Sequence, residues 1–187
     1  ENIARDLALA KDAGFTDIVV DVRPTTGDVL FKTNLVDQVK FMYAWIGSNY
    51  TKVERTATWD YLQAFVDEAR KQGLRIHAAI NTFVGGNQID GGTGLLYRDQ
   101  SKAEWATQMN MQVGITSVMN TSESTKFFNP AHPEVQTFLC DLLKDLAGYD
   151  LDGIFLDRGR FLNLQADFSE ESRKQFEEYM GGSRIQN

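Results

Sequence analysis

Hydrophobic residues follow two different spacings along this chain, and the spacing predicts which segments are helices and which are strands. Segments in which apolar residues recur every three or four positions predict helices over 2–13, 58–73, 133–146 and 169–181. Short apolar runs, rich in β-branched residues, predict strands over 17–23, 75–81 and 151–157. Helices and strands alternate, which is typical of an α/β fold with a parallel sheet.

The predicted helix ends carry residues that suit those positions. Thr58 and Ser169 are expected to cap helix starts, and Pro133 fits a first helical turn. Gly14 and Gly73 are expected just past helix ends. The chain has 187 residues, the size of one ordinary domain, so we expect a single domain over 1–187.

The connections are strongly asymmetric. Each helix leads into the next strand almost at once, whereas the first two strands are followed by the long segments 24–58 and 82–128. In α/β folds the ligand site lies at the carboxyl ends of the strands, where the elaborated loops gather. We therefore expect the functional site at this edge of the sheet.

A polar residue closes each predicted strand. These residues are Arg23, Asn81 and Asp157, and side-chain alternation places Asp21 on the same strand face as Arg23. The strand that ends at Asp157 is expected to be covered on both faces. If the strands are neighbours, Arg23, Asn81 and Asp157 converge. The alternative is that Asp157 caps the next loop or pairs with Arg158 or Arg160.

Composition and charge narrow the class of partner. The formal net charge is −7 and no basic run occurs, so no nucleic-acid partner is predicted. No apolar run approaches the roughly 20 residues of a membrane-spanning helix. Cys140 is the single cysteine and forms no internal disulfide. The chain opens directly on a helix, as though upstream sequence were missing, so these residues alone indicate no compartment.

The strand-end residues and the loop aromatics are compatible with a polyhydroxylated ligand. Asn supplies a donor and an acceptor, Arg supplies donors, and flat aromatic faces can stack on sugar rings. Core packing is the better interpretation of any one aromatic, and Trp59 in particular, but as a set they favour a carbohydrate. The set is Tyr43, Trp45, Tyr50, Trp59, Tyr97 and Trp105.

The sequence gives little support for a metal site, a phosphate-binding loop or a serine nucleophile. His77 and His132 are far apart and lack metal-ligand spacing, so neither a metal nor another cofactor is predicted. His77 is expected to hydrogen-bond within the strand layer, and His132 either starts a helix or faces the site. The glycine-rich segment 84–94 lacks the Lys-Ser/Thr of a phosphate loop and is interpreted as a flexible rim. No nucleophile-elbow motif occurs.

The chain resembles the glycosyl hydrolase-like 10 family over nearly its whole length. The resemblance lies in ARDLALAKDAGFTDIVVDVRPTTGDVLF, WDYLQAFVDEARKQGLRIHAAIN, FFNPAHPEVQTFLCDLLKDLAGYDLDGIFLDRGRF and DFSEESRKQFEEYMG. It implies a bacterial glycoside hydrolase on a (β/α)8 barrel, distantly similar to α-amylase and α-galactosidase barrels. This chain would then be a partial (β/α)8 TIM barrel running from the first helix through the fourth strand and the helix after it.

The resemblance also implies roles for individual residues. Asp157 would be the nucleophile or stabiliser at the end of the fourth barrel strand. Substrate-facing roles fall to Arg23, Asp28, Asn81, Asn129 and His132, and we add Arg158 and Arg160 beside the nucleophile.

The chain departs from the family pattern after Asp157. Arg158, Gly159, Arg160 and Phe161 stand where the family often has a second Asp and then aromatics. In related barrels the acid/base comes from a later strand, so it is expected outside this chain. Asp21 and Asp167 are nearby substitutes, and neither is assigned that role.

We therefore expect a glycoside hydrolase acting on a poly- or oligosaccharide. One alternative is a non-catalytic carbohydrate-binding barrel. Another is an inactive fragment that self-associates as a homo-oligomer through exposed sheet edges. The resemblance implies a periplasmic, cell-surface or secreted protein.

Overall fold

The structure, a computed structural model, describes residues 1–182 of the chain. Its helices are α1 (Asn2–Asp12), α2 (Tyr61–Gln72), α3 (Leu95–Arg98), α4 (Pro133–Leu146) and α5 (Glu170–Tyr179). Its strands are β1 (Asp17–Arg23), β2 (Phe41–Ile46), β3 (Asn49–Glu54), β4 (Arg75–Asn81), β5 (Val84–Asn87), β6 (Gln108–Met111), β7 (Gly114–Ser117), β8 (Thr125–Phe127) and β9 (Gly153–Asp157). The predicted mixed α/β class is confirmed.

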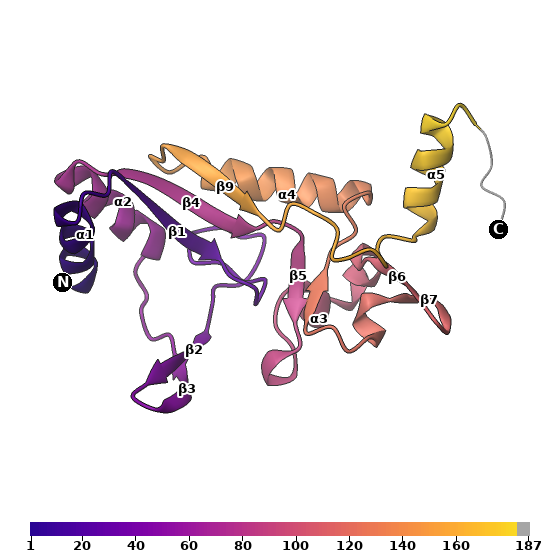
Figure 1. Ribbon diagram of the computed structural model, residues 1–187, viewed down its shortest axis with the longest axis horizontal. Coiled ribbons are helices and arrows are strands. Elements are labelled where there is room, and N and C mark those ends of the chain that lie inside the picture. Colours follow the sequence, from indigo (N-terminus) through magenta and orange to yellow (C-terminus); the bar gives the residue numbers. More distant parts are fainter. Residues whose placement is uncertain (183–187) are drawn as a thin grey trace.

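A three-stranded parallel sheet with the order β1-β4-β9 organises the fold (Figure 1). Each crossover between its strands contains one main helix, α2 between β1 and β4 and α4 between β4 and β9. The predicted strands and helices are confirmed in type and place. All three strands end at the same edge of the sheet, as parallel pairing requires.

Capping residues fix where the helices begin and end. The backbone N–H of Gln63 donates to the Asp60 carboxylate at 3.1 Å, so Asp60 caps α2. This cap lies two residues after the predicted cap, Thr58. Gly73 ends α2 with φ +70°, a conformation that glycine adopts without strain. His132 caps α4 and Ser169 caps α5, where Ser169 had been predicted.

The hydrophobic core lies between one face of the sheet and the helices. Ile76, Ala78 and Ile80 of β4 are buried there together with side chains of α2 and α4. On the opposite face Val19 is 58% exposed and Phe155 57% exposed. The prediction that the strand ending at Asp157 is covered on both faces is therefore wrong. β9 is an edge strand, and no element among residues 1–182 covers this second face.

A bulge in β1 changes which side chains share a face. Asp21 pairs with Ala79, but Arg23 pairs with Ile80, so one residue of β1 is extra. Arg23 consequently leaves the face that carries Asn81 and Asp157. The expected convergence of these three side chains is wrong for Arg23.

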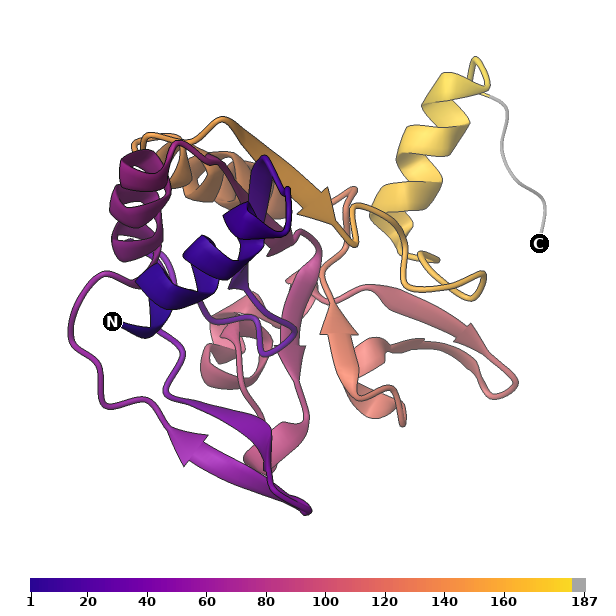
Figure 2. The same ribbon diagram turned by 60° about the vertical axis from the view of Figure 1, so that its left-hand side comes forward.

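The two long connections hold small antiparallel units that were not predicted. β2 pairs with β3, β5 with β8 and β6 with β7, and a 3-10 helix covers Gln100–Trp105. Figure 2 shows the β2–β3 hairpin standing apart from the parallel sheet at the end of two extended chain segments. Among residues 1–182, no helix is both long enough and apolar enough to cross a bilayer.

Candidate functional site

Asp157 and Asn81 are register partners at the carboxyl edge of the sheet. The Asp157 side chain is exposed, and its Oδ1 accepts a hydrogen bond from the Arg158 backbone N–H at 2.7 Å. Arg158 has φ +48°, so the chain turns sharply directly after the carboxylate. No hydrogen bond within residues 1–182 occupies the second carboxylate oxygen, which leaves it open to a ligand.

Asp21, rather than Arg23, is the β1 residue beside this pair. Asn81 Nδ2 lies 3.5 Å from Asp21 Oδ2, and the Arg23 backbone N–H donates to Asp21 Oδ1 at 3.1 Å. Burial raises the pKa of the Asp21 carboxyl, and the Asp157 charge adds to the rise. Two carboxyls in different environments therefore serve one edge of the sheet. Side-chain alternation had placed Asp21 on the same strand face as Arg23, but the sequence assigned Asp21 no role in the site.

The Arg23 side chain is fully buried behind the site. Its guanidinium donates to the backbone carbonyls of Asn81 and Val84, close to the end of β4, and lies 6.0 Å from the centre of the Phe128 ring. Burial lowers the pKa of Arg23 to about 10. Arg23 therefore holds the junction between β4 and β5 and presents no surface to a ligand.

Three further residues of the predicted substrate set have structural partners. Asp28 is buried in an ion pair with Arg98, and burial raises the pKa of its carboxyl against the effect of that arginine. Asn129 is buried, and its Nδ2 donates to Ser169 Oγ at 2.9 Å, which ties the start of α5 to the loop before α4. The Nδ1 atom of His132 accepts from the Glu134 N–H at 3.2 Å, as one of its two predicted roles requires.

The two arginines after Asp157 differ. The Arg160 guanidinium donates to the carbonyls of Phe161 at 2.9 Å and Leu162 at 2.7 Å, so it orders its own loop. Arg158, the residue directly after Asp157, is half-buried. Of the two, Arg158 is the one left to meet a ligand at Asp157.

Both carboxylate oxygens of Asp167 accept hydrogen bonds from neighbouring residues. Burial favours its neutral form, but hydrogen bonds from Ser169, Ser172, Gln108 and Thr107 outweigh burial and hold the pKa of Asp167 below its usual value. A carboxylate held in this way is a poor proton donor. Leaving Asp167 without a catalytic role is consistent with these contacts.

A cavity of about 530 Å³ adjoins Asp21 and lies under the β2–β3 hairpin. Its size is within the range of small-molecule sites, roughly 300–1,000 Å³. The rings of Tyr43 and Tyr50 are stacked with centroids 5.3 Å apart, and Trp59 and Tyr61 are stacked at 5.9 Å. These four rings line the cavity together with Asp21 and Arg55.

The other aromatics of the predicted set lie outside this cavity. Trp45 is exposed and rests against Tyr50 with ring centroids 5.3 Å apart. Trp105 is buried in the core against Phe128 and Phe138, and Tyr97 packs over the glycine turn at Gly92. Core packing, the general expectation for a single aromatic, holds for Trp105 and not for the half-exposed Trp59.

Asp90 anchors the hairpin that roofs the cavity. Its carboxylate accepts from the Tyr43 hydroxyl at 2.7 Å and pairs with Lys52 at 2.6 Å. Lys52 first and Tyr43 second hold the pKa of Asp90 below its usual value. The aromatic wall is thus attached to the turn after β5, and sequence reasoning missed this link because the two segments are about forty residues apart.

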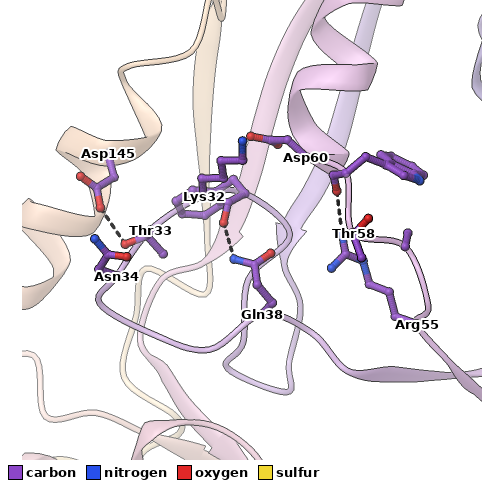
Figure 3. A pocket seen from close by; sticks show the side chains of 11 residues that line it. Lys32, Thr33, Asn34, Gln38, Arg55, Thr58, Asp60 and Asp145 are labelled. Carbon is purple, nitrogen blue, oxygen red and sulfur yellow. Dashed lines mark hydrogen bonds between the residues drawn. The ribbon is translucent and has the colours of Figure 1, made fainter.

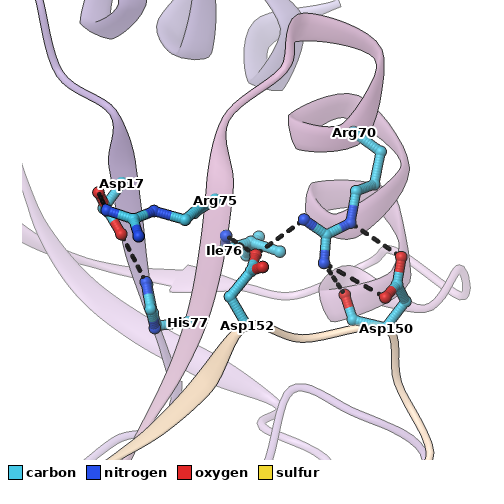
Figure 4. A network of polar contacts seen from close by, with 7 residues as sticks. All are labelled: Asp17, Arg70, Arg75, Ile76, His77, Asp150 and Asp152. Carbon is cyan, nitrogen blue, oxygen red and sulfur yellow. Dashed lines mark hydrogen bonds and ion pairs between the residues drawn. The ribbon is translucent and has the colours of Figure 1, made fainter.

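A separate polar network closes the amino-terminal edge of the sheet (Figure 4). His77 Nε2 lies 2.8 Å from Asp17 Oδ1, as expected of a histidine that hydrogen-bonds within the strand layer. A Cβ at Gly153 would meet His77 Nδ1 at 2.8 Å, which explains the glycine at this position. Arg70 forms ion pairs with Asp150 and Asp152 at 2.8 Å, so the two aspartates just before β9 attach this strand to α2.

Comparison with known proteins places the chain in a family. The model of the family described as Glycosyl hydrolase-like 10 matches residues 3–184. This chain belongs to the glycosyl hydrolase-like 10 family. The resemblance stated from the sequence motifs is confirmed. An S-layer-related protein from Niallia circulans is 31% identical over 195 residues, and the match covers all of this chain but 12% of that protein.

Solved structures share the fold of this glycosyl hydrolase-like 10 chain. An alpha-L-fucosidase isoenzyme 2 from Paenibacillus thiaminolyticus matches with a TM-score of 0.62 and 18% identity, over 97% of this chain and 23% of that one. A hypothetical protein from Ruminiclostridium thermocellum matches with a TM-score of 0.58 and 15% identity, over 96% and 82%. An isomaltulose synthase mutant from Erwinia rhapontici in complex with sucrose matches with a TM-score of 0.55 and 15% identity, over 96% and 35%.

Proposed function

We propose that residues 1–187 form a single domain that is one sector of a (β/α)8 barrel. Residues 183–187 of that domain lie outside the described part of the chain. The sequential order β1-β4-β9 with helical crossovers supports the proposal. So does the open, apolar second face of the sheet at Val19 and Phe155, where a barrel would pack its interior.

We propose that this domain carries part of the active site of a glycoside hydrolase. One observation carries the proposal: Asp157 and Asn81 meet at the carboxyl edge of the sheet, where Asp21 connects them to the aromatic cavity. The family supports an activity on carbohydrates. The sugar ring would lie against the aromatic side chains with its hydroxyls toward the carboxyl edge.

In the proposed reaction Asp157 attacks the anomeric carbon or stabilises the positive charge that develops there. If it attacks, a bond forms between its carboxylate oxygen and the anomeric carbon while the glycosidic bond breaks, and water later releases the sugar. The leaving oxygen takes its proton from an acid that we assign to a segment outside residues 1–187. The Arg158 backbone N–H would keep the Asp157 carboxylate in one orientation.

The neighbours of Asp157 would hold the sugar in place. Asp21, whose pKa is raised by burial, can be protonated more readily than an ordinary carboxyl and donate to a sugar hydroxyl. Asn81 and Arg158 supply further donors. We propose that Arg23, Asp28 and Asn129 support the site without touching the sugar, because their side chains are buried against protein partners. His132 and Arg160 would also act through their loops.

A trapping experiment tests the nucleophile. The full-length protein is incubated with a panel of 2-deoxy-2-fluoro glycosyl fluorides, and tryptic peptides are sequenced by mass spectrometry. A label on Asp157, within the peptide 145–158, supports the assignment. A label on another residue would overturn the nucleophilic role and leave Asp157 at most a charge stabiliser.

A location outside the cytoplasm is proposed as well. The relative from Niallia circulans is an S-layer-related protein, which supports a surface or secreted location. Because this chain spans only about one eighth of that relative, the activity and partners of the whole protein are part of the proposal.

A non-catalytic carbohydrate-binding barrel is the second candidate. The observation that favours it is the sequence after the nucleophile position, where Arg158 and Arg160 stand and Asp157 is hydrogen-bonded by its own loop. Retained glycan affinity with no cleavage of any substrate would select this candidate.

Self-association through the edges of the sheet is the third candidate. β1 and β9 are edge strands, and Phe155 and Val19 are exposed beside them. Light scattering that gives the monomer mass at high concentration would exclude it. A dimer that Phe155→Ser dissociates would support it.

A further inference from the structure

A second cavity lies on the other side of the Arg55–Trp59 segment. It has a volume of about 730 Å³ and is bounded by the loop after β1, the start of α2 and the end of α4 (Figure 3). Arg55, Ala57 and Trp59 line both this cavity and the aromatic cavity beside Asp21. The two hollows are therefore separated only by one short stretch of chain.

Trp59 is the platform between the two hollows. Its side chain is half-exposed, and its ring stacks on Tyr61 with an interplanar angle of 16°. Tyr61 in turn lies near Asp21, and burial together with that carboxyl raises the pKa of the tyrosine. The Arg55 guanidinium donates to the Trp59 backbone carbonyl at 3.1 Å, which fixes the shared stretch. A row of flat faces thus leads from Asp21 into the second cavity.

The second cavity is lined with polar groups of both signs. Figure 3 shows Thr33 and Asn34 beside Asp145 on one side of the cavity, Arg55 and Thr58 on the other, and the Lys32 side chain extending toward Asp60. Asp60 Oδ2 accepts from the Tyr149 hydroxyl at 2.6 Å, and Thr33 donates to Asp145 at 2.6 Å, so these acids are already partnered. Within residues 1–182 the Lys32 ammonium and the Asn34 amide have no hydrogen-bond partner.

This combination suits a chain of neutral sugars. A pyranose ring has apolar faces that stack on aromatic planes and a rim of hydroxyls that both donate and accept hydrogen bonds. The two cations, Lys32 and Arg55, are balanced by Asp60 and Asp145, so a strongly anionic chain gains no net attraction. A site for a single sugar would not need two such hollows joined by an aromatic platform.

We propose that the two cavities form one cleft for an extended neutral glycan, with Trp59 as the platform between successive sugar subsites. The inference rests on the proposed function, because it places the reacting sugar at Asp157 and the rest of the chain across Trp59. It predicts that affinity rises with glycan length, and that the part of the rise due to the distal sugars depends on Trp59.

Affinity as a function of chain length tests the cleft. The full-length protein carrying Asp157→Asn is titrated with neutral gluco-, xylo- and mannooligosaccharides from disaccharides to octasaccharides, and with hyaluronan oligosaccharides as the anionic comparison. Trp59→Ala is added in the same background. Tyr179→Ala, which removes an exposed aromatic from α5, is the matched control. We expect Trp59→Ala to weaken binding of the long neutral chains about tenfold and of the disaccharides much less.

The outcomes separate the cleft from the hydrolase. Equal loss for short and long chains, a length profile unchanged by Trp59→Ala, or preference for hyaluronan would overturn the cleft even if the wild-type protein cleaves glycans. A Trp59-dependent length profile in a protein that cleaves nothing would keep the cleft and reject the hydrolase. Trp59→Phe should recover most of the affinity, which a mere folding defect in Trp59→Ala would not explain.

Discussion

At the scale of single residues, the two carboxyls at the carboxyl edge of the sheet have unlike surroundings. Asp157 Oδ1 accepts a hydrogen bond from the Arg158 N–H, whereas Asp21 Oδ1 accepts one from the Arg23 N–H and its Oδ2 lies 3.5 Å from Asn81 Nδ2. Burial favours the neutral form of Asp21. Unlike environments of this kind let paired carboxyls take different roles.

If Asp21 binds sugar and is not the acid, Asp21→Asn should lower kcat/KM by a similar factor for all leaving groups. We expect a loss of about tenfold to a hundredfold, as for removal of one charged hydrogen-bonding group. The measurement compares aryl glycosides of a preferred sugar that carry good and poor leaving groups. A defect confined to poor leaving groups would instead make Asp21 the general acid.

The raised pKa of Asp21 also predicts how stability depends on pH. In the unfolded chain an aspartate has a pKa of about 3.9. In the folded protein the pKa of Asp21 is higher. The stability that this shift contributes is fully present below the unfolded pKa and is lost as pH rises through the folded pKa. The wild type should therefore lose stability relative to Asp21→Asn across that window, as measured by urea unfolding at several pH values.

The matched control for this measurement is Gln112→Asn, which changes an exposed side chain without adding or removing a titratable group. Its stability difference from the wild type should stay flat over the same pH range. A stability difference between wild type and Asp21→Asn that stays flat as well would contradict the raised pKa of Asp21.

Arg23 should matter for stability. Arg23→Met removes the charged hydrogen bonds that the buried guanidinium donates to the Asn81 and Val84 carbonyls. We expect a loss of about 3 kcal/mol in the free energy of unfolding. Arg5→Met, at an exposed arginine of α1, should change it by less than about 0.5 kcal/mol. If the two variants are equally stable, the buried role of Arg23 is wrong.

At the scale of elements, the β2–β3 hairpin forms the aromatic wall, and its attachment rests on Asp90. Asp90→Ala removes the acceptor of Tyr43 and the partner of Lys52. We expect faster hydrogen exchange in 41–54 and weaker glycan binding, with the parallel sheet unchanged. Asp99→Ala, which removes a helix-capping aspartate elsewhere, should leave exchange in the hairpin unaffected. Unchanged exchange in Asp90→Ala would mean that the hairpin is held by other contacts.

The sequence predicted the elements whose signal is local. The strands β1 and β4 and the helices α2 and α4 follow from periodicity and capping residues, and the strand ends placed Asn81 and Asp157 at one edge. The β2–β3 hairpin was missed although Phe41, Tyr43 and Trp45 alternate just before Gly47. That glycine has φ +62° in a two-residue turn, which is a usable hairpin signal.

The sequence pattern could not predict that Asp21, and not Arg23, is the β1 residue at the site. It depends on one extra residue between Asp21 and Arg23, and a bulge leaves no mark in the pattern of apolar positions. The shared wall of the two cavities likewise depends on how the long connection folds back over α2. Both features arise from contacts between segments distant in the chain.

At the scale of the whole molecule, the described sheet has a helix-covered face and an open face. The open face carries Val19, Phe155 and the two carboxyls, so apolar residues and the proposed catalytic positions lie on the same side, as the proposed barrel requires. The match covers 12% of the S-layer-related relative. We propose that the acid and the rest of the barrel lie on segments outside residues 1–187.

The most direct test of a glycosidase centred on Asp157 is hydrolysis by the full-length protein and its Asp157→Asn variant. A panel of aryl glycosides and polysaccharides is assayed, with Asp150→Asn, at the opposite edge of the sheet, as the control. We predict that Asp157→Asn lowers turnover of the preferred substrate by at least about a thousandfold with the fold intact, while Asp150→Asn retains it. Cleavage by Asp157→Asn at the wild-type rate would contradict the account.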